Sequence, residues 1–588
     1  MRTKALVCGV ACALAASVGA GGPAADAPVG GELADFVRGY NEDWSSVRRF
    51  YPQQWSAVRP DRTATLCDEY TARLNAIDFD SLAQQGKIDW LLLRHRMEYE
   101  KLLAERQKRW TKEIEEFLPF KDDVLALFDA QQNMRAVDPQ SAAGVLNGFA
   151  KEVAAVRKRL EAGKKGEKEF KDEAGAGPLE STPVLAKRAS DATNSLRRSL
   201  ATWYSYYDGY QPDFSWWVRK PYEEAAKTLD EYSNYLRKEL AGLKGEPDDP
   251  LVGAPIGADG LAADLAVEMM PYTPAELVMI GEREFAWCEA EMKKASAEMG
   301  FGDDWKKALE KVKTQHAPPG GQDEVVAEQS REAIKFLQDK DLITLPPLAV
   351  ETWRLEMSSP ETQRYLPFAA YNEQAMTVGY PTDTMKHDDK LMSMRGNNIH
   401  FTRIVTPHEL IPGHHLQIFM ERRIRPHRQF FSTPFFIEGW CLYWEMMLWD
   451  KGWAKGPEDR VGMLFWRMHR CARIIVSLNF HLGTMSPQQM IDFLVDRVGH
   501  ERMTATSEVR RYVGPEYSPL YQCGYMIGGM QLRALRRETV DKGTIPEKQF
   551  HDEVLTYGAI PMEMVRAGVM KLPLTRDWKA GWRFGEGK

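Results

Sequence analysis

Apolar residues recur at helical spacing along most of this chain of 588 residues, and that periodicity limits its fold more than any other feature. Between Asp80 and Arg109, for example, Ile88, Leu91 and Leu92 alternate with charged side chains so that a helix would have one apolar face. Helices of this kind bury that face against one another, so we predict a mainly α fold with many helices. The same pattern covers residues 31–160, 191–243, 273–299 and 406–570.

Two loop-like segments indicate how the chain is divided. Residues 161–191 are rich in Gly and charged side chains, and Gly245–Pro250 contains two prolines and three acidic residues. Such compositions are typical of solvated connections between helical regions. We therefore expect an N-terminal helical region over residues 21–250 and a second helical region over residues 251–588.

Prolines set the stretch from about 344 to 402 apart from the helical segments. Leu348-Ala349-Val350 and Asn398-Ile399-His400-Phe401 have β-leaning composition within it. We predict irregular chain with short strands here, forming a small sheet beside a cleft.

The N-terminus has the features of a secretory signal peptide. Two basic residues precede an apolar run that ends at Val18, and Gly19 and Ala20 complete a small-residue cleavage site. This run is too short for a membrane span, and no later segment is apolar enough for one. We predict that residues 1–20 are removed and that the protein is periplasmic or secreted. Lipoprotein anchoring through Cys12 is a less favoured alternative.

Charge and cysteine content argue against two classes of protein. The net charge of −7 gives no sign of the basic surface that a nucleic-acid partner requires. The cysteines beyond the signal peptide are odd in number and form no CxxC pair, so we expect buried thiols rather than a disulfide framework or a thiolate zinc site. They are Cys67, Cys288, Cys441, Cys471 and Cys523.

The segment His408-Glu409-Leu410-Ile411-Pro412-Gly413-His414-His415 carries the strongest chemical signal. In many zinc hydrolases two His at i and i+4 of a helix bind the metal, and the Glu after the first His acts on a water molecule. Here Thr406 and Pro407 suit the start of a helix, but Pro412 occupies the i+4 position. Because Pro412 lacks an N–H and Gly413 permits unusual dihedrals, we predict a bulge that turns a later His toward the metal.

Two histidines compete for the second ligand position. His415 returns to the face of His408 but would lie about 10.5 Å along an unbroken helix, which is too far for shared ligation. A two-residue bulge would instead give His414 the role of the i+4 ligand. We favour His414, with His415 as the alternative.

Glu438 is the best candidate for a third metal ligand. It lies in the apolar segment Phe435–Glu445, where a carboxylate is out of place unless it is paired or binds a metal. Glu445 follows two helical turns later on about the same face. It could orient a ligating His or form a salt bridge.

Three residues further along the chain are candidates for contacts with substrate. Tyr525 and His481 could donate hydrogen bonds to a developing oxyanion, a contribution of about 3–4 kcal/mol when such a donor is well placed. Arg511 could hold a carboxylate of the substrate.

At these motifs the sequence resembles the bacterial domain-of-unknown-function family 885. The hallmark His-Glu-x-x-Pro-Gly-His-His-x-Gln is present over 408–417, and Glu-Gly-Trp-x-Leu-Tyr-x-Glu over 438–445. The similarity extends over roughly residues 31–575. Two departures concern the contacts with substrate: Ser477 replaces a frequent Asp, and residues 519–522 read Pro-Leu-Tyr-Gln where Pro-Gly-Gln-Ala is usual.

The resemblance implies a zincin-like metallopeptidase fold with a central cleft, one Zn²⁺ per chain and a glutamate as third ligand. We therefore expect a zinc hydrolase, in the first place a peptidase, with Glu409 as general base. Its expected partner is a peptide or another small amide. The alternatives are a zinc amidase or esterase with a non-peptide substrate, and an inactive exported binding protein.

Overall fold

The computed structural model describes residues 31–245, 249–363, 366–515 and 517–585. The predicted signal peptide (1–20) and Cys12 lie outside these ranges. The described chain is mainly helical with one small sheet, as predicted. None of its helices combines the length and the apolar composition needed to cross a membrane.

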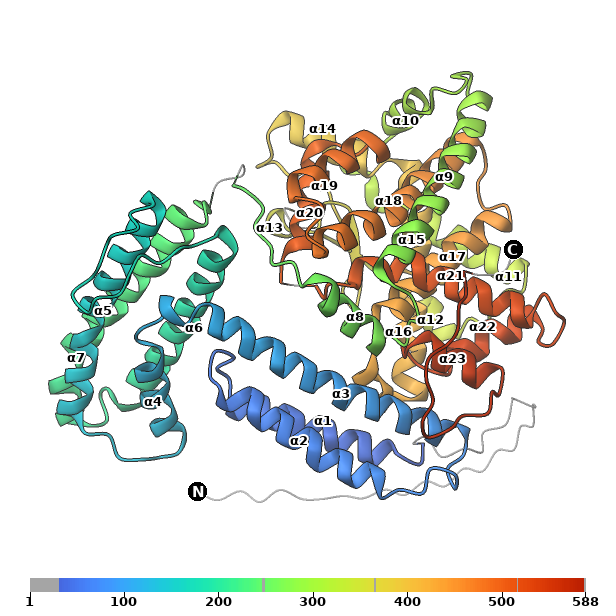
Figure 1. Cartoon of the computed structure of the whole chain (residues 1–588). Coiled ribbons are helices and arrows are strands. Elements are labelled where there is room, and N and C mark those ends of the chain that lie inside the picture. The colour runs from blue at the N-terminus through green and yellow to red at the C-terminus, as the bar shows by residue number, and fades with distance from the viewer. Residues whose placement is uncertain (1–30, 246–248, 364–365, 516, 586–588) are drawn as a thin grey trace, which may run out of the picture.

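The first part of the chain forms two groups of helices (Figure 1). The blue helices are α1 (Ala34–Phe50), α2 (Val58–Asn75) and α3 (Gln84–Glu113), with the short η1 (Glu115–Phe117) after them. A bundle that stands apart from the rest of the molecule follows. It comprises α4 (Lys121–Gln132), α5 (Pro139–Lys165), α6 (Pro183–Tyr207), α7 (Pro212–Tyr235) and the π-helical η2 (Leu236–Leu240).

The buried apolar side chains form two large clusters that do not divide at residue 250. Trp203, Phe214 and Tyr232 belong to the core of the α4–α7 bundle, here called the bundle lobe. Tyr40 and Trp90, from α1 and α3, join the core of the C-terminal helices, here called the main lobe. The predicted boundary at residue 250 stays a prediction, but packing groups the first three helices with the second region.

The main lobe contains the remaining elements. Its first helices are α8 (Gly257–Val267), α9 (Pro274–Glu298), α10 (Trp305–Lys313), α11 (Gln322–Asp339), α12 (Pro347–Thr352), α13 (Pro360–Gln363) and α14 (His387–Gly396). The central helices are α15 (Ile399–Glu409), α16 (His414–Ile424), η3 (Pro426–Phe431), α17 (Pro434–Asp450) and α18 (Pro457–His481). The last are α19 (Pro487–Phe493), η4 (Leu494–Val498), α20 (Arg502–Val513), α21 (Tyr521–Thr539), α22 (Glu547–Leu555) and α23 (Met562–Val569).

The small sheet predicted between residues 344 and 402 is present, but two of its proposed segments are wrong. The strands are β1 (Leu355–Met357), β2 (Ala369–Tyr371) and β3 (Met376–Val378), in the order β1-β3-β2, with β1 parallel and β2 antiparallel to β3. Residues 348–350 lie instead in α12, and residues 398–401 form the start of α15. Pro347 at the first position of α12 and the Asn398 cap of α15 override the weak β preference of these segments.

Capping residues in the sequence predicted one helix start correctly and another wrongly. Thr273 caps α9 and forms the expected reciprocal box with Glu276. The predicted helix start at Thr406 is wrong, because α15 begins at Ile399. Asn398 caps α15 by accepting hydrogen bonds from two backbone N–H groups, so Pro407 lies inside the helix and His408 near its end.

The backbones of α17 and α21 meet at Gly439 and Gly528. A Cβ atom on Gly528 would lie 1.9 Å from the carbonyl oxygen of Phe435, and one on Gly439 would lie 2.6 Å from Gly528 Cα. Only glycine permits so close an approach. This contact fixes the distance between the two helices that carry Glu438 and Tyr525.

We predict that Gly528→Ala destabilises the protein by about 1–3 kcal/mol or more, because the added methyl group forces α21 away from α17. The free energy of unfolding would be measured by urea denaturation followed by circular dichroism. Gly144→Ala is the matched control, since an exposed helical glycine with nothing within 4 Å of the added Cβ should gain about 0.5–1 kcal/mol. Equal stability of Gly528→Ala and the natural chain would contradict the account.

Candidate metal centre

A turn between α15 and α16 sets the position of the two histidines. The predicted bulge inside one helix is replaced by an end and a restart: α15 stops at Glu409 and α16 begins at His414. Gly413 makes the reversal possible, because a Cβ there would lie 1.7 Å from the carbonyl oxygen of His408. The imidazole rings of His408 and His414 consequently meet edge to face, with centroids 5.1 Å apart and planes at 84°.

Helix α17 brings Glu438 to the same point. Its Oε2 atom lies 3.5 Å from His408 Nε2 and 3.3 Å from His414 Nε2, and all three side chains are buried. A tetrahedral zinc ion with bonds of about 2.0–2.1 Å keeps neighbouring ligand atoms about 3.4 Å apart. The spacing of these donor atoms therefore fits a zinc ion, and the two-imidazole, one-carboxylate set suits that metal.

Cys441 is a second neighbour of the two histidines. Its Sγ atom and a nitrogen of each imidazole lie within 4.8 Å of one another. Burial, followed by the carboxylates of Glu438 and Glu409, raises the pKa of the Cys441 thiol well above its usual range. A bound metal would itself deprotonate a thiol, so we propose Glu438 as the third ligand from its distances of 3.5 and 3.3 Å to the two imidazole nitrogens.

Glu445 and Tyr521 hold the proposed ligands in place. Glu445 Oε1 lies 2.7 Å from His408 Nδ1, which leaves Nε2 facing the centre. The Tyr521 hydroxyl donates to Glu438 Oε1 at 2.5 Å. Such outer contacts fix the orientation of metal ligands in many sites.

The charges around His408 favour a cation at this point. Burial alone would lower the pKa of His408, but Glu438 and Glu445 outweigh it and raise the pKa to about 9. The pKa of Glu438 lies well below its usual range, because His414 and His408 outweigh the effect of burial. In each case a positive charge is stabilised between these side chains.

Glu409 and Tyr525 lie beside the three proposed ligands. Glu409 ends α15 directly after His408, is 8% exposed and has no hydrogen-bond or ion-pair partner among the described residues. The ring of Tyr525 stacks over His408, with centroids 6.1 Å apart and planes at 12°. Burial raises the pKa of the Tyr525 hydroxyl, which therefore stays protonated and can donate a hydrogen bond.

Two arginines of α18 lie against the ring of Tyr525. The guanidinium groups of Arg470 and Arg473 lie 4.6 and 4.3 Å from its ring centroid. Arg470 also reaches Glu445, and Arg473 donates to Glu508 at 2.8 Å. They add positive charge beside the proposed centre.

The structure places His415 away from the other three side chains. Its Nδ1 atom lies 2.9 Å from the Tyr371 hydroxyl of β2, and its Nε2 atom lies 2.9 Å from the carbonyl oxygen of Ala349. Both ring nitrogens are therefore engaged by protein groups. This geometry favours His414 as the second ligand, with His415 joining the small sheet to α16.

His481 and Arg511 lie in a neighbouring cleft rather than beside His408. His481 follows Arg473 by eight residues on α18, a rise of about 12 Å. Arg511 bonds Glu508 at 2.9 Å, and its guanidinium lies 5.2 Å from the Tyr517 ring centroid. Both residues line the cleft, so any role they have is with substrate some distance from the proposed metal.

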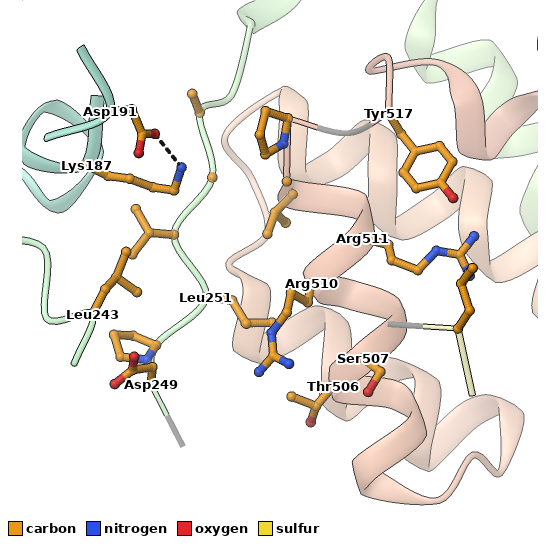
Figure 2. A pocket seen from close by; sticks show the side chains of 18 of the residues that line it. Lys187, Asp191, Leu243, Asp249, Leu251, Thr506, Ser507, Arg510, Arg511 and Tyr517 are labelled. Carbon is orange, nitrogen blue, oxygen red and sulfur yellow. Dashed lines mark hydrogen bonds and ion pairs between the residues drawn. The ribbon is translucent and has the colours of Figure 1, made fainter. Parts of the chain in front are cut away.

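The cleft has a volume of about 2330 Å³ and runs between the bundle lobe and the main lobe. Figure 2 shows Lys187 and Asp191 of α6 on one side, with Arg510, Arg511 and Tyr517 on the other. The side chains of His408, His414 and Glu438 are not part of its lining.

Sequence reasoning missed three side chains at this centre: Tyr521, Arg470 and Cys441. Tyr521 precedes Tyr525 by one helical turn, and that spacing could have placed both on one face of α21. Arg470 is a charge inside a largely apolar helix, which itself suggests a buried partner. Cys441 follows Glu438 at i+3 on α17, so helical spacing could have found it too.

Comparison with known proteins shows the family of the chain. A family model for bacterial proteins of unknown function (DUF885) matches residues 50–569. The chain belongs to the DUF885 family. The curated proteins include none that matches this DUF885 chain.

Two solved structures resemble the DUF885 chain over nearly its whole length. One, from Shewanella oneidensis, is 18% identical, with a TM-score of 0.65, and the match covers 92% of this chain and 100% of the other. The second, from Colwellia psychrerythraea, is 14% identical, with a TM-score of 0.58 and coverage of 92% and 98%. Each is described as a "putative lipoprotein", the first of unknown function. At these identities the likeness shows a shared fold alone.

We predict that His414→Ala abolishes stoichiometric zinc binding, whereas His415→Ala leaves it intact. Of these two histidines, only His414 directs a ring nitrogen at Glu438. Loss of His415 leaves the Tyr371 hydroxyl without its partner and should cost about 1–3 kcal/mol of stability. Zinc content of the purified variants would be measured by plasma mass spectrometry, with urea denaturation alongside. Full zinc content in His414→Ala together with none in His415→Ala would reverse the assignment.

We predict that Glu445→Gln weakens zinc binding about 10- to 100-fold, because it removes the charge behind His408. The affinity would be measured by competition with a chromophoric chelator. Glu421→Gln is the control, since this buried carboxylate accepts a hydrogen bond from the Ala559 N–H, away from the centre. Equal zinc affinities for the two variants would refute a supporting role for Glu445.

Proposed function

We propose that this protein is an exported zinc-dependent hydrolase and, more narrowly, a peptidase. The observation that carries the proposal is the convergence of His408, His414 and Glu438 beside a buried, unpaired Glu409. Three protein ligands beside a general base are typical of catalytic zinc sites, whereas a structural zinc site commonly has four protein ligands and needs no base. This chemistry supports a hydrolase over an inactive binding protein.

A bound zinc ion would supply an activated water molecule and polarise the scissile carbonyl group. Glu409 takes the proton of the attacking water and returns it to the leaving amine. The hydroxyl of Tyr525, whose ring stacks over His408, donates a hydrogen bond to the developing oxyanion. His481 lies in the wall of the cleft, so its predicted contact with the oxyanion stays a prediction.

The local architecture supports a zincin-like arrangement. A His-Glu pair ends one helix, the carboxylate ligand comes from a later helix, and a short sheet lies beside the second helix through the contact of Tyr371 with His415. Peptide specificity is proposed from the family motifs and the adjoining cleft. A zinc amidase or esterase is the alternative that a panel of substrates separates.

Export is proposed from the sequence of residues 1–20. That two structures with the same fold are described as lipoproteins agrees with it. Cleavage after residue 20 and lipidation at Cys12 would both place the protein outside the cytoplasm, and mass spectrometry of the mature N-terminus separates them.

We predict that Glu409→Gln keeps one zinc ion per chain but loses hydrolysis by at least about 100-fold, because it removes the proton acceptor. Zinc content and cleavage of a mixed peptide library would be compared by mass spectrometry between the natural chain and the variant. Absence of metal in the natural chain after metal-replete preparation would exclude the zinc site. Equal cleavage by both proteins would exclude Glu409 as the base.

A further inference from the structure

The cleft between the lobes is cationic in a protein whose net charge is −7. Among the described residues of its lining, nine are Lys or Arg and three are Asp. Five of these cations have carboxylate partners, such as Arg106 with Asp264 at 2.8 Å and Arg511 with Glu508 at 2.9 Å. The remaining cations make the cleft an exception to the acidic character of the molecule.

Four cations of the cleft have no acidic partner in the described ranges of the chain. Arg198 and Arg237 come from α6 and η2, on the side of the bundle lobe, and Lys386 and Arg510 come from the main lobe. Positive charges therefore face the same space from both sides. Asp249 and Asp389 also line the cleft, so its described lining carries an excess of positive charge, and such an excess concentrates anionic ligands.

The wall of the cleft also contains a polar group that lacks a partner. His481 is 5% exposed, and neither of its ring nitrogens has a hydrogen-bond partner in the described structure. Burial and the nearby Arg106 lower its pKa to about 4, so the ring is neutral near pH 7 and can both donate and accept. A buried, unsatisfied ring of this kind in a cavity wall points to a polar ligand.

The wall of the cleft is connected to the proposed metal centre through side-chain contacts. Figure 2 shows Arg510 and Arg511 leaving α20 in different directions, with Arg511 directed toward Tyr517. The ring of Tyr517 lies 4.5 Å from that of Tyr521, whose hydroxyl binds Glu438. A chain lying in the cleft is thus two aromatic side chains away from a proposed zinc ligand.

We propose that the cleft binds peptides rich in Asp and Glu and that Arg198, Arg237 and Arg510 select them. That the ligand is a peptide rests on the proposed peptidase function. That the ligand is anionic is inferred from the unpaired cations of the cleft. Pockets for small molecules usually measure about 300–1,000 Å³, so a cleft of about 2330 Å³ suits an extended chain of several residues. Arg511 is held by Glu508, so it contributes less than its unpaired neighbour Arg510.

The test measures binding separately from hydrolysis. Fluorescence anisotropy would follow a short labelled peptide of alternating Glu and Ala, and its counterpart with Gln for Glu, on the full Glu409→Gln chain. We expect the acidic peptide to bind at least about tenfold more tightly, with a preference that falls as salt is added. Adding Arg198→Gln, Arg237→Gln and Arg510→Gln should remove most of that preference.

Lys158→Gln, Lys293→Gln and Lys311→Gln together form the matched control, since they remove the same charge from exposed positions outside the cleft. Circular dichroism and thermal melting would verify that both triple variants fold. Equal binding of the two peptides, or equal loss in both triple variants, would overturn the proposal. So would an oligodeoxynucleotide that binds as tightly as the acidic peptide.

The outcomes separate this proposal from the proposed function. Selective binding of the acidic peptide without cleavage by the natural chain would support the acidic selectivity of the cleft and exclude the proposed peptidase function. Cleavage of both peptides with equal kcat/KM, together with equal binding, would support the proposed peptidase function and exclude the proposed selectivity for acidic peptides.

Discussion

The backbone contact between α17 and α21 determines the geometry of the proposed centre. Glu438 stands next to Gly439, and Tyr525 stands three residues before Gly528, so the contact of the two glycines also fixes these side chains. The Trp440 indole donates to the carbonyl oxygen of Pro412 at 2.8 Å and thereby ties α17 to the turn that presents His414. The two sequence motifs are thus parts of one packing arrangement, in which small residues permit approach and an aromatic residue locks it.

Electrostatics explains why this arrangement calls for a cation. Burying the carboxylates of Glu438 and Glu445 in one place is costly unless positive charge compensates them. Arg470 forms an ion pair with Glu445, whereas Glu438 contacts two imidazoles and a tyrosine hydroxyl. A divalent ion between the imidazoles and Glu438 would supply charge that a proton on one ring supplies only in part. The burial of Glu438 therefore supports the proposed metal as much as the histidine motif does.

Local patterns in the sequence predicted most of the fold and those residues of the proposed centre that lie close together along the chain. Helical periodicity and the capping box at Thr273 act over a few residues, and they are readable without tertiary structure. The helix start at Thr406 failed, because a cap further upstream, Asn398, makes two hydrogen bonds and lets the helix run through Pro407. His481 and Tyr525 looked equivalent along the chain, but only the packing of α18 against α21 shows that one lies in the cleft and the other over His408.

The long helix α3 explains how a cleft can persist between two separate cores. Its first turns pack in the main lobe, and its later residues, including Arg106, line the cleft. Arg106 forms a buried ion pair with Asp264 of α8, and Gln53, ahead of α2, bonds Ser195 and Ser199 of α6. One rigid helix and these polar contacts therefore set the distance between the walls without filling the space between them. With the cleft held open in this way, the protein would lose little conformational entropy on binding the proposed peptide, and the selectivity would depend mainly on the charges that line the cleft.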